Sequence, residues 1–135
     1  LEAINKSKPQ RVITVFQPHL YSRTKDLYKE FGEAFSGTDI LILDKIYPAR
    51  ENEIAGVSSS MILGEYNDSN IRKGNVGKKK EPGIYIENRE LIMEELEKIS
   101  REGDVIIFQG AGDITDLCNK YIKRIKAKIN WTVPL

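Results

Sequence analysis

Short apolar runs alternate with longer amphipathic stretches along this chain, and no other feature limits the fold as strongly. The runs that predict strands lie at residues 11–16, 40–43, 84–86 and 105–108. The stretches that predict helices lie at residues 24–35, 58–66, 89–100 and 114–127. Strands that alternate with helices pair in parallel, and almost continuously apolar strands are buried on both faces. The sequence therefore predicts a three-layer α/β domain with a mostly parallel sheet and helices on both faces.

Helical periodicity assigns an inner face to three of the predicted helices. The inner-face residues are Leu27, Phe31, Ala34 and Phe35, then Leu91, Ile92, Leu96 and Ile99, then Ile114, Leu117, Cys118, Tyr121, Ile122 and Ile125. Thr24 and Asn88 are residue types that cap helix N-termini, so we expect each to begin its helix.

Three segments fall outside the alternation. Residues 1–8 look like the end of a helix and the chain begins at Leu1 rather than Met, so we expect it to be part of a longer protein; a processed N-terminus is the alternative. Residues 67–82 are rich in Gly and Lys and predict a flexible excursion. Residues 130–135 are compatible with an antiparallel edge strand, because Pro134 is tolerated only at the edge of a sheet.

Composition excludes several classes of protein. The 135 residues suffice for one domain, and 21 basic against 20 acidic residues give a formal charge of +1. A dedicated nucleic-acid-binding protein would show a strong basic excess. The single cysteine, Cys118, excludes an internal disulfide framework and indicates a reducing compartment, so we expect a cytoplasmic protein. No apolar run approaches the roughly 20 residues that span a bilayer, so no membrane partner is expected.

Three polar loops follow predicted strands, at residues 17–23, 44–51 and 109–113. The carboxyl ends of parallel strands share one edge of a sheet, where open α/β sheets bind ligands. We therefore expect the three loops to form one composite site.

Two residues of the first loop are candidate ligand contacts. His19, the only histidine, is a candidate ligand contact or proton carrier, or else it packs within its loop. Arg23 stands at a helix entry, where the field of the helix is already positive and a cation gains nothing. A bound anion would explain this position, and a surface salt bridge is the alternative.

The other two loops add further candidates. Gly110, Ala111 and Gly112 precede a helix, so their backbone N–H groups could face a carboxylate or phosphate, or the glycines simply make a tight turn. Asp113 lies at the positive end of that helix. The Arg50–Glu51 pair could bind a zwitterion such as an amino acid, or be solvated. The sequence contains no metal-ligand cluster, nucleophile–base pair or G-x-x-x-x-G-K-[ST] loop, so it predicts a binding site without catalytic groups of its own.

Several segments occur together, in order, as in a known family. They read FQPHLYSRT at 16–24, IYPARE at 46–51, IAGVS at 54–58, GDV at 103–105 and GAGDI at 110–114. In these segments the chain resembles the C-terminal, Rossmann-like domain of the Mur ligases. The resemblance covers nearly all of residues 1–135 except 67–82 and the tail.

The resemblance implies an ATP-dependent ligase of peptidoglycan precursor synthesis. ATP phosphorylates the muramoyl carboxylate of UDP-N-acetylmuramate, the amine of L-alanine attacks the acyl phosphate, and Mg²⁺ supports the phosphoryl transfer. A complete enzyme has an N-terminal UDP-binding domain and a central ATPase domain, both absent from this chain. ATP, Mg²⁺ and UDP-N-acetylmuramate would bind through those domains. The isolated C-terminal domain is expected to hold no cofactor and to be inactive.

The resemblance also assigns roles to residues. Arg23 matches the arginine that contacts the amino-acid carboxylate, and His19 matches the histidine of the same loop. Leu20 stands where family members often carry a second arginine, which puts a two-arginine clamp in doubt. Residues 47–51 and 110–113 correspond to loops that face the amino acid.

Two other classes of function fit the architecture. A stand-alone nucleotide- or flavin-binding module would also be built from alternating strands and helices and would use the Gly110–Gly112 turn. A protein-interaction domain is the third alternative.

Overall fold

The computed structural model describes residues 11–72 and 81–128 as alternating strands and helices. In chain order the elements are β1 (Arg11–Gln17), α2 (Tyr21–Ala34), β2 (Ile40–Leu43), α3 (Ser60–Arg72), β3 (Ile84–Tyr85), α4 (Arg89–Ile99), β4 (Asp104–Gly110) and α5 (Ile114–Lys128). Every predicted strand and helix within these ranges is present. The segments predicted as a helix end (1–8) and an edge strand (130–135) lie outside the described residues.

The sheet is four-stranded and parallel throughout the described residues, in the order β3-β2-β1-β4. Val15 of β1 pairs with Ile42 on one side and Phe108 on the other. The predicted Rossmann-like α/β architecture is therefore confirmed.

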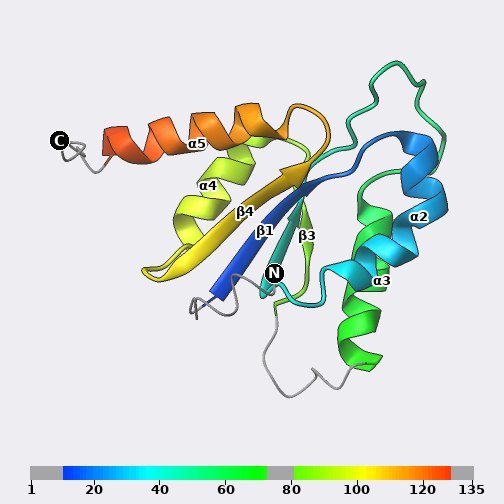
Figure 1. Ribbon diagram of the computed structural model, residues 1–135, viewed down its shortest axis with the longest axis horizontal. Coiled ribbons are helices and arrows are strands. Elements are labelled where there is room, and N and C mark those ends of the chain that lie inside the picture. The colour runs from blue at the N-terminus through cyan, green and yellow to red at the C-terminus, as the bar shows by residue number, and fades with distance from the viewer. Residues whose placement is uncertain (1–10, 73–80, 129–135) are drawn as a thin grey trace.

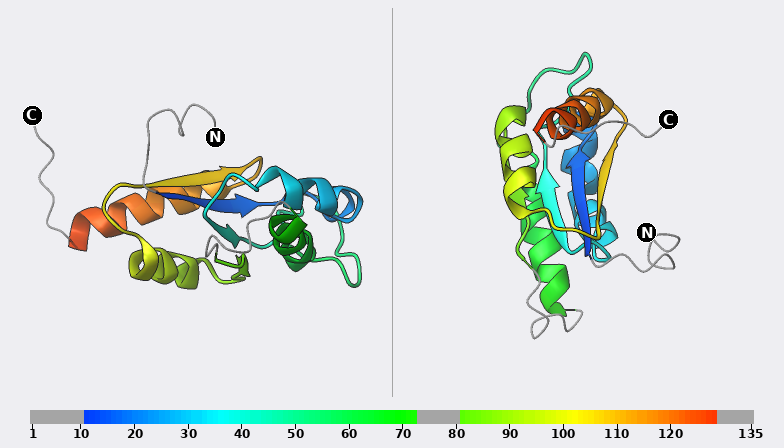
Figure 2. Two further views of the ribbon diagram at one scale, coloured as in Figure 1. Left: turned by 90° about the horizontal axis from the view of Figure 1, so that it is seen from below. Right: turned by 90° about the vertical axis from the view of Figure 1, so that its left-hand side faces the viewer.

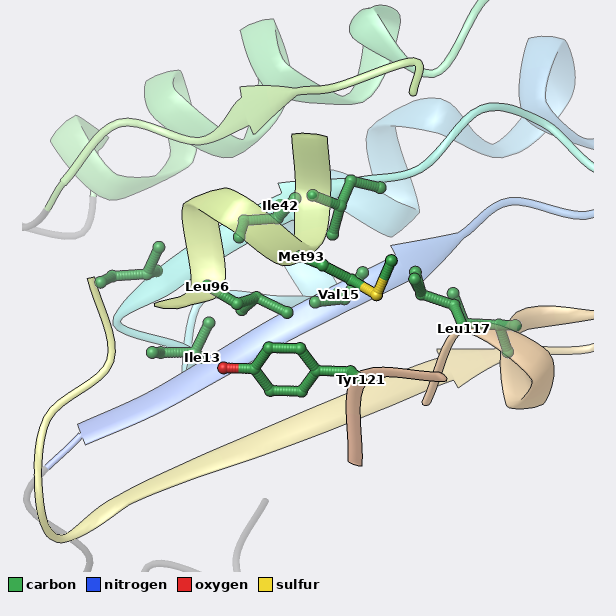
Figure 3. Close-up of a cluster of buried hydrophobic side chains, with 10 residues drawn as sticks. Ile13, Val15, Ile42, Met93, Leu96, Leu117 and Tyr121 are labelled. Carbon is green, nitrogen blue, oxygen red and sulfur yellow. The ribbon is translucent and has the colours of Figure 1, made fainter. Parts of the chain in front are cut away.

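Two apolar layers fill the space between the sheet and its helices, because alternate strand residues point to opposite faces. One layer joins Ile13 and Val15 of β1 and Ile42 of β2 to α4 and α5 (Figure 3). The other layer joins Phe16, Leu41 and other residues to α2 and α3 on the opposite face. Figures 1 and 2 show the two helix pairs on either side of the sheet. The predicted coverage of both faces is confirmed.

The order in which strands are added to the sheet reverses between β1 and β4, although all four strands run in the same direction. From β1 the chain moves outward through β2 to β3, and it then returns to place β4 on the other side of β1. In open α/β sheets, ligands bind at the carboxyl ends of the strands where this reversal occurs. The fold therefore directs attention to the ends of β1 and β4.

Two predicted helix boundaries are wrong. The helix after β1 begins at Tyr21 rather than Thr24, and Thr24 lies inside it with its hydroxyl donating to the Leu20 carbonyl. The helix predicted to end near residue 66 continues to residue 72. The predicted excursion is therefore wrong for 67–72, where Ser69 and Asn70 are buried and packing overrides their weak helix propensity. Residues 73–80 lie outside the described ranges.

Helical periodicity also misplaced three side chains. Leu91 and Ile122 are 52% and 42% exposed, and Ala34 is exposed as well. The buried face of α4 consists of Ile92, Met93 and Leu96. The buried stripe is therefore rotated by one residue relative to the predicted one, which included Leu91. The Asn88 cap is confirmed, since its side chain accepts a hydrogen bond from Leu91 N.

Candidate functional site

The loops after β1 and β2 are joined by backbone hydrogen bonds. Tyr47 N donates to the Pro18 carbonyl and Leu20 N donates to the Tyr47 carbonyl, each at 2.9 Å. The His19 and Tyr47 rings stack with centroids 5.8 Å apart and planes 15° apart. His19 therefore packs against the neighbouring loop, and its ring helps to fix the two loops relative to each other.

The turn after β4 closes on these two loops through its glycines. A Cβ added to Gly112 would lie 2.4 Å from Tyr47 Cγ, and one added to Gly110 would lie 2.9 Å from the Gln17 carbonyl oxygen. No side chain fits at either place without displacing a neighbour. Gly110 is the last residue of β4, paired with Gln17 in the sheet. All three predicted loops thus meet at one edge of the sheet, as Figure 1 shows at the arrowheads of β1 and β4.

A pocket of about 320 Å³ opens between the ends of β1 and β4. It is lined by Phe16, Gln17, His19, Arg23, Phe31, Gln109, Gly110 and Ala111. The fold therefore brings four predicted site residues together at the ends of β1 and β4, where the strand order reverses: His19, Arg23, Gly110 and Ala111. We call this the β1–β4 pocket.

Arg23 is the cation of the β1–β4 pocket. Its side chain is exposed, and within residues 11–72 and 81–128 no ion pair of Arg23 is present. The surface salt bridge considered as an alternative is thus not formed with any described residue. The pocket combines one guanidinium with aromatic walls from Phe16 and Phe31, which suits a small anion that carries an apolar group.

Glu51 is engaged with the N-terminus of α2. Its carboxylate accepts hydrogen bonds from Ser22 N at 3.1 Å and from the Ser22 hydroxyl. Both hydrogen bonds lower the pKa of the Glu51 carboxyl, and the bond from the Ser22 hydroxyl has the larger effect. Leu20, the N-cap residue of α2, makes no capping hydrogen bond with its side chain, so Glu51 caps the helix from a distant loop. Arg50 is exposed, and neither Arg50 nor Glu51 lines the β1–β4 pocket.

Leu20 has an unusual backbone, with φ 70° and ψ 138°. Residues with a side chain rarely adopt this conformation, and such strain concentrates at binding sites. The strained peptide lies between His19 and the first turn of α2. It sets the direction in which the loop enters the helix that carries Arg23.

Asp113 is held in a polar network rather than free. Its carboxylate accepts hydrogen bonds from Gln17 Nε2 at 2.7 Å and from Arg89 Nη2 at 2.6 Å. The Gln17 hydrogen bond, together with the Arg89 guanidinium, lowers the pKa of the Asp113 carboxyl. Gln17 Oε1 in turn accepts from Ile114 N, the first residue of α5.

Sequence reasoning missed Arg89 and Asp44, which complete this network. Arg89 Nη2 lies 2.8 Å from Oδ2 of Asp44, whose carboxylate is completely buried. Arg89 begins α4, where a cation is disfavoured by the helix field. The same reasoning that selected Arg23 would therefore have selected Arg89, had it been applied to every helix.

A larger pocket of about 600 Å³ is lined by Lys45, Ile46 and Pro48 of the predicted loop 44–51, together with residues that include Tyr21 and Tyr85. None of the individually predicted site residues lines it. Among the described residues, no three His, Cys, Asp or Glu side chains converge as a metal site would require. No helix in the described part of the chain is long and apolar enough to cross a membrane.

Comparison with known proteins gives a consistent result. No protein-family model matches the chain. It is 40% identical over 126 residues to UDP-N-acetylmuramate–L-alanine ligase of Pelotomaculum thermopropionicum, a match that spans 93% of this chain and 25% of the relative. The predicted resemblance to the Mur ligases is confirmed.

Two further Mur ligases with the same name match equally broadly. The ligase of Desulforamulus reducens is 36% identical over 95% of this chain and 26% of its own length. The ligase of Clostridium tetani is 38% identical over 91% of this chain and 25% of its own length. The chain thus spans about a quarter of the length of the curated relatives that it matches.

Proposed function

We propose that this chain is the C-terminal, amino-acid-side domain of a UDP-N-acetylmuramate–L-alanine ligase, acting in the cytoplasm in peptidoglycan precursor synthesis. The single observation that carries the proposal is the β1–β4 pocket lined by Arg23, in a chain that matches about a quarter of the length of these ligases. The UDP-binding and ATPase domains would lie in the remainder of the longer protein.

Within this function the domain binds and orients L-alanine. Arg23 would pair with its carboxylate, as a guanidinium suits that group. The apolar walls of the pocket would accept its methyl group, and the N–H groups of the Gly110–Gly112 turn would add hydrogen bonds. His19, stacked on Tyr47, would hold the loop that leads to Arg23. Orienting the amine toward an activated carboxyl group accelerates amide formation chiefly by positioning.

ATP and Mg²⁺ would supply the activation of the muramoyl carboxyl group. The described residues form no group of metal-ligating side chains and the chain has no phosphate-binding Gly-x-x-x-x-Gly-Lys loop. We therefore assign neither ATP nor Mg²⁺ to residues of this domain. We propose that Glu51 and Asp113 support the amino-acid-facing loops, because both already have protein partners. We propose the same supporting role for Arg50.

An activity assay of the full-length protein tests the function. Incubated with ATP and Mg²⁺, it should release phosphate only when UDP-N-acetylmuramate and L-alanine are both present, and mass spectrometry should detect the alanylated sugar nucleotide. Phosphate release that does not depend on the amino acid would contradict the proposal.

A titration of the 135-residue chain with ATP and with flavin mononucleotide tests the alternative module. We expect no tight binding of either. Tight binding would favour a stand-alone nucleotide-binding function.

A further inference from the structure

Arg89 bridges two carboxylates that come from different loops of the site. Its Nη2 lies 2.8 Å from Asp44 Oδ2, at the end of β2, and 2.6 Å from Asp113 Oδ1, in the turn before α5. Arg89 Nε also donates to Asp44 Oδ2 at 3.2 Å, and Nη1 donates to the Asp113 carbonyl at 3.4 Å. One guanidinium therefore connects the start of the loop after β2 to the end of the turn after β4.

Each of the two carboxylates has further fixed partners. Asp44 Oδ1 accepts from Lys45 N at 2.9 Å, and the Asp44 carbonyl accepts from the Ser59 hydroxyl. Asp113 Oδ1 also accepts from the buried Gln17 side chain. Arg89 is thus the middle of a chain of hydrogen bonds that runs across the carboxyl ends of β2, β1 and β4.

The network reaches the β1–β4 pocket through two direct contacts. Gly112, next to Asp113, lies against the Tyr47 ring, and Tyr47 stacks on His19. Gln17, which binds Asp113, lines the pocket beside Gly110. A displacement of Asp113 relative to Asp44 would therefore move the glycine turn relative to the loop that carries His19.

We propose that Arg89 is a positioning residue of the amino-acid site, setting the distance between the loop after β2 and the turn after β4 without touching the substrate. This inference rests on the proposed function. It assigns to α4, which contributes no residue to the β1–β4 pocket, control over the geometry of that pocket.

Arg124 provides a matched control within the same molecule. It too bridges two carboxylates, Glu90 and Glu97, and its side chain is 23% exposed against 26% for Arg89. Arg124 lies on α5 and lines none of the pockets at the loops. Each arginine bridges two carboxylates, although Asp44 is fully buried while Glu90 and Glu97 are 61% and 19% exposed. Only the Arg89 bridge joins site loops.

The test compares Arg89→Lys with Arg124→Lys in the full-length protein. Lysine keeps the positive charge beside buried Asp44, but its shorter side chain lacks the Nε and Nη1 donors with which Arg89 also contacts Asp44 and the Asp113 carbonyl. It therefore cannot reproduce the guanidinium bridge. We expect Arg89→Lys to raise the KM for L-alanine roughly tenfold or more, since small misplacements are costly in catalysis. The KM for ATP should change no more than in Arg124→Lys. The thermal midpoint should fall further in Arg89→Lys than in Arg124→Lys, because Asp44 is fully buried and the partners of Arg124 are not. An unchanged KM for L-alanine would overturn the inference.

A second variant guards against a folding defect. Asp113→Ala removes the acceptor of Arg89 and leaves the buried Asp44–Arg89 pair intact, and the Asp113 side chain is 46% exposed. Its KM for L-alanine should rise with normal far-UV circular dichroism. If Arg89→Lys does not fold, a normal KM in Asp113→Ala overturns the inference.

Arg23→Ala, measured in parallel, separates this inference from the proposed function. If Arg23→Ala raises the KM for L-alanine while Arg89→Lys leaves it unchanged, only the inference about Arg89 fails. If neither change affects the KM, the proposed amino-acid site itself is wrong.

Discussion

The Tyr47 ring lies against Gly112 so closely that a methyl group on Gly112 would come within 2.4 Å of Tyr47 Cγ. The backbone of Gly112 does not have a positive φ, so the glycine is required for space and not for conformation. The contact joins the loop after β2 to the turn after β4. It therefore determines how the two loops close around the β1–β4 pocket.

Gly112→Ala should separate these loops. We expect a destabilisation of about 1–3 kcal/mol from overpacking, and a raised KM for L-alanine in the full-length protein. In a Tyr47→Ala background the clash with the ring is removed and the contact with Gln17 Oε1, at 2.8 Å, remains, so the further cost of Gly112→Ala should shrink. A double-mutant cycle measured by urea unfolding checks this, and strictly additive costs would contradict the contact.

Gly32 and Gly64 should respond oppositely to alanine. A Cβ on Gly32 of α2 would lie 2.7 Å from Glu65 Cβ and 2.8 Å from Tyr66 N of α3, whereas one on Gly64 would meet nothing within 4 Å. We expect Gly32→Ala to destabilise the domain by about 1–3 kcal/mol. Gly64→Ala should stabilise it by about 0.5–1 kcal/mol through helix propensity. Unfolding curves that show the same sign for both would refute the close packing of α2 on α3.

The Glu51 carboxyl should titrate below its ordinary range, because Ser22 donates two hydrogen bonds to it. Ser22→Ala removes the hydroxyl donor, so the pKa of Glu51 should move back toward its usual value. Side-chain carboxyl chemical shifts followed against pH measure both values. Identical titrations in the two proteins would exclude this cap of α2.

Asp104 should make stability depend on pH. Its side chain is 2% exposed and accepts from Arg11 Nε at 3.0 Å and Nη2 at 2.7 Å. The Arg11 hydrogen bonds lower the pKa of Asp104 in the folded state. The stabilisation is therefore complete above the unfolded pKa of about 3.9 and is lost as pH falls through the lower folded value.

Asp104→Asn tests that sign. The variant should be less stable than the parent by about 1.5–3 kcal/mol at neutral pH. The difference in unfolding free energy between the parent and Asp104→Asn should narrow as the pH falls below about 4. Urea unfolding at a series of pH values measures it, and a difference that grows on acidification would contradict the account.

Much of the architecture could be predicted from local pattern. Four apolar runs in alternation with helices were enough for the parallel sheet, and Asn88 marked its helix start correctly. The end of α3 could not be predicted, because residues 67–70 are weak helix formers that tertiary packing holds in a helix. Leu91 and Ile122 were misplaced because periodicity alone leaves the edges of an apolar stripe undefined.

The candidate site was predictable in part. Parallel strand ends brought His19, Arg23, Gly110 and Ala111 to one pocket, as the loop positions indicated. The position of Arg89 at a helix start was a signal in the sequence, but its two partners lie 45 and 24 residues away, a relation that only the folded chain reveals. The partners of Glu51 and Asp113 depended on long-range geometry in the same way.

The KM for L-alanine of Arg23→Ala in the full-length protein tests the central claim most directly. Lys25→Ala is the matched control, since Lys25 is an exposed cation of the same helix outside the β1–β4 pocket. We expect Arg23→Ala to raise the KM by about tenfold to a hundredfold, as loss of a charge-assisted contact implies. Lys25→Ala should leave it unchanged. Equal KM values for Arg23→Ala and the parent protein would contradict an amino-acid site at Arg23.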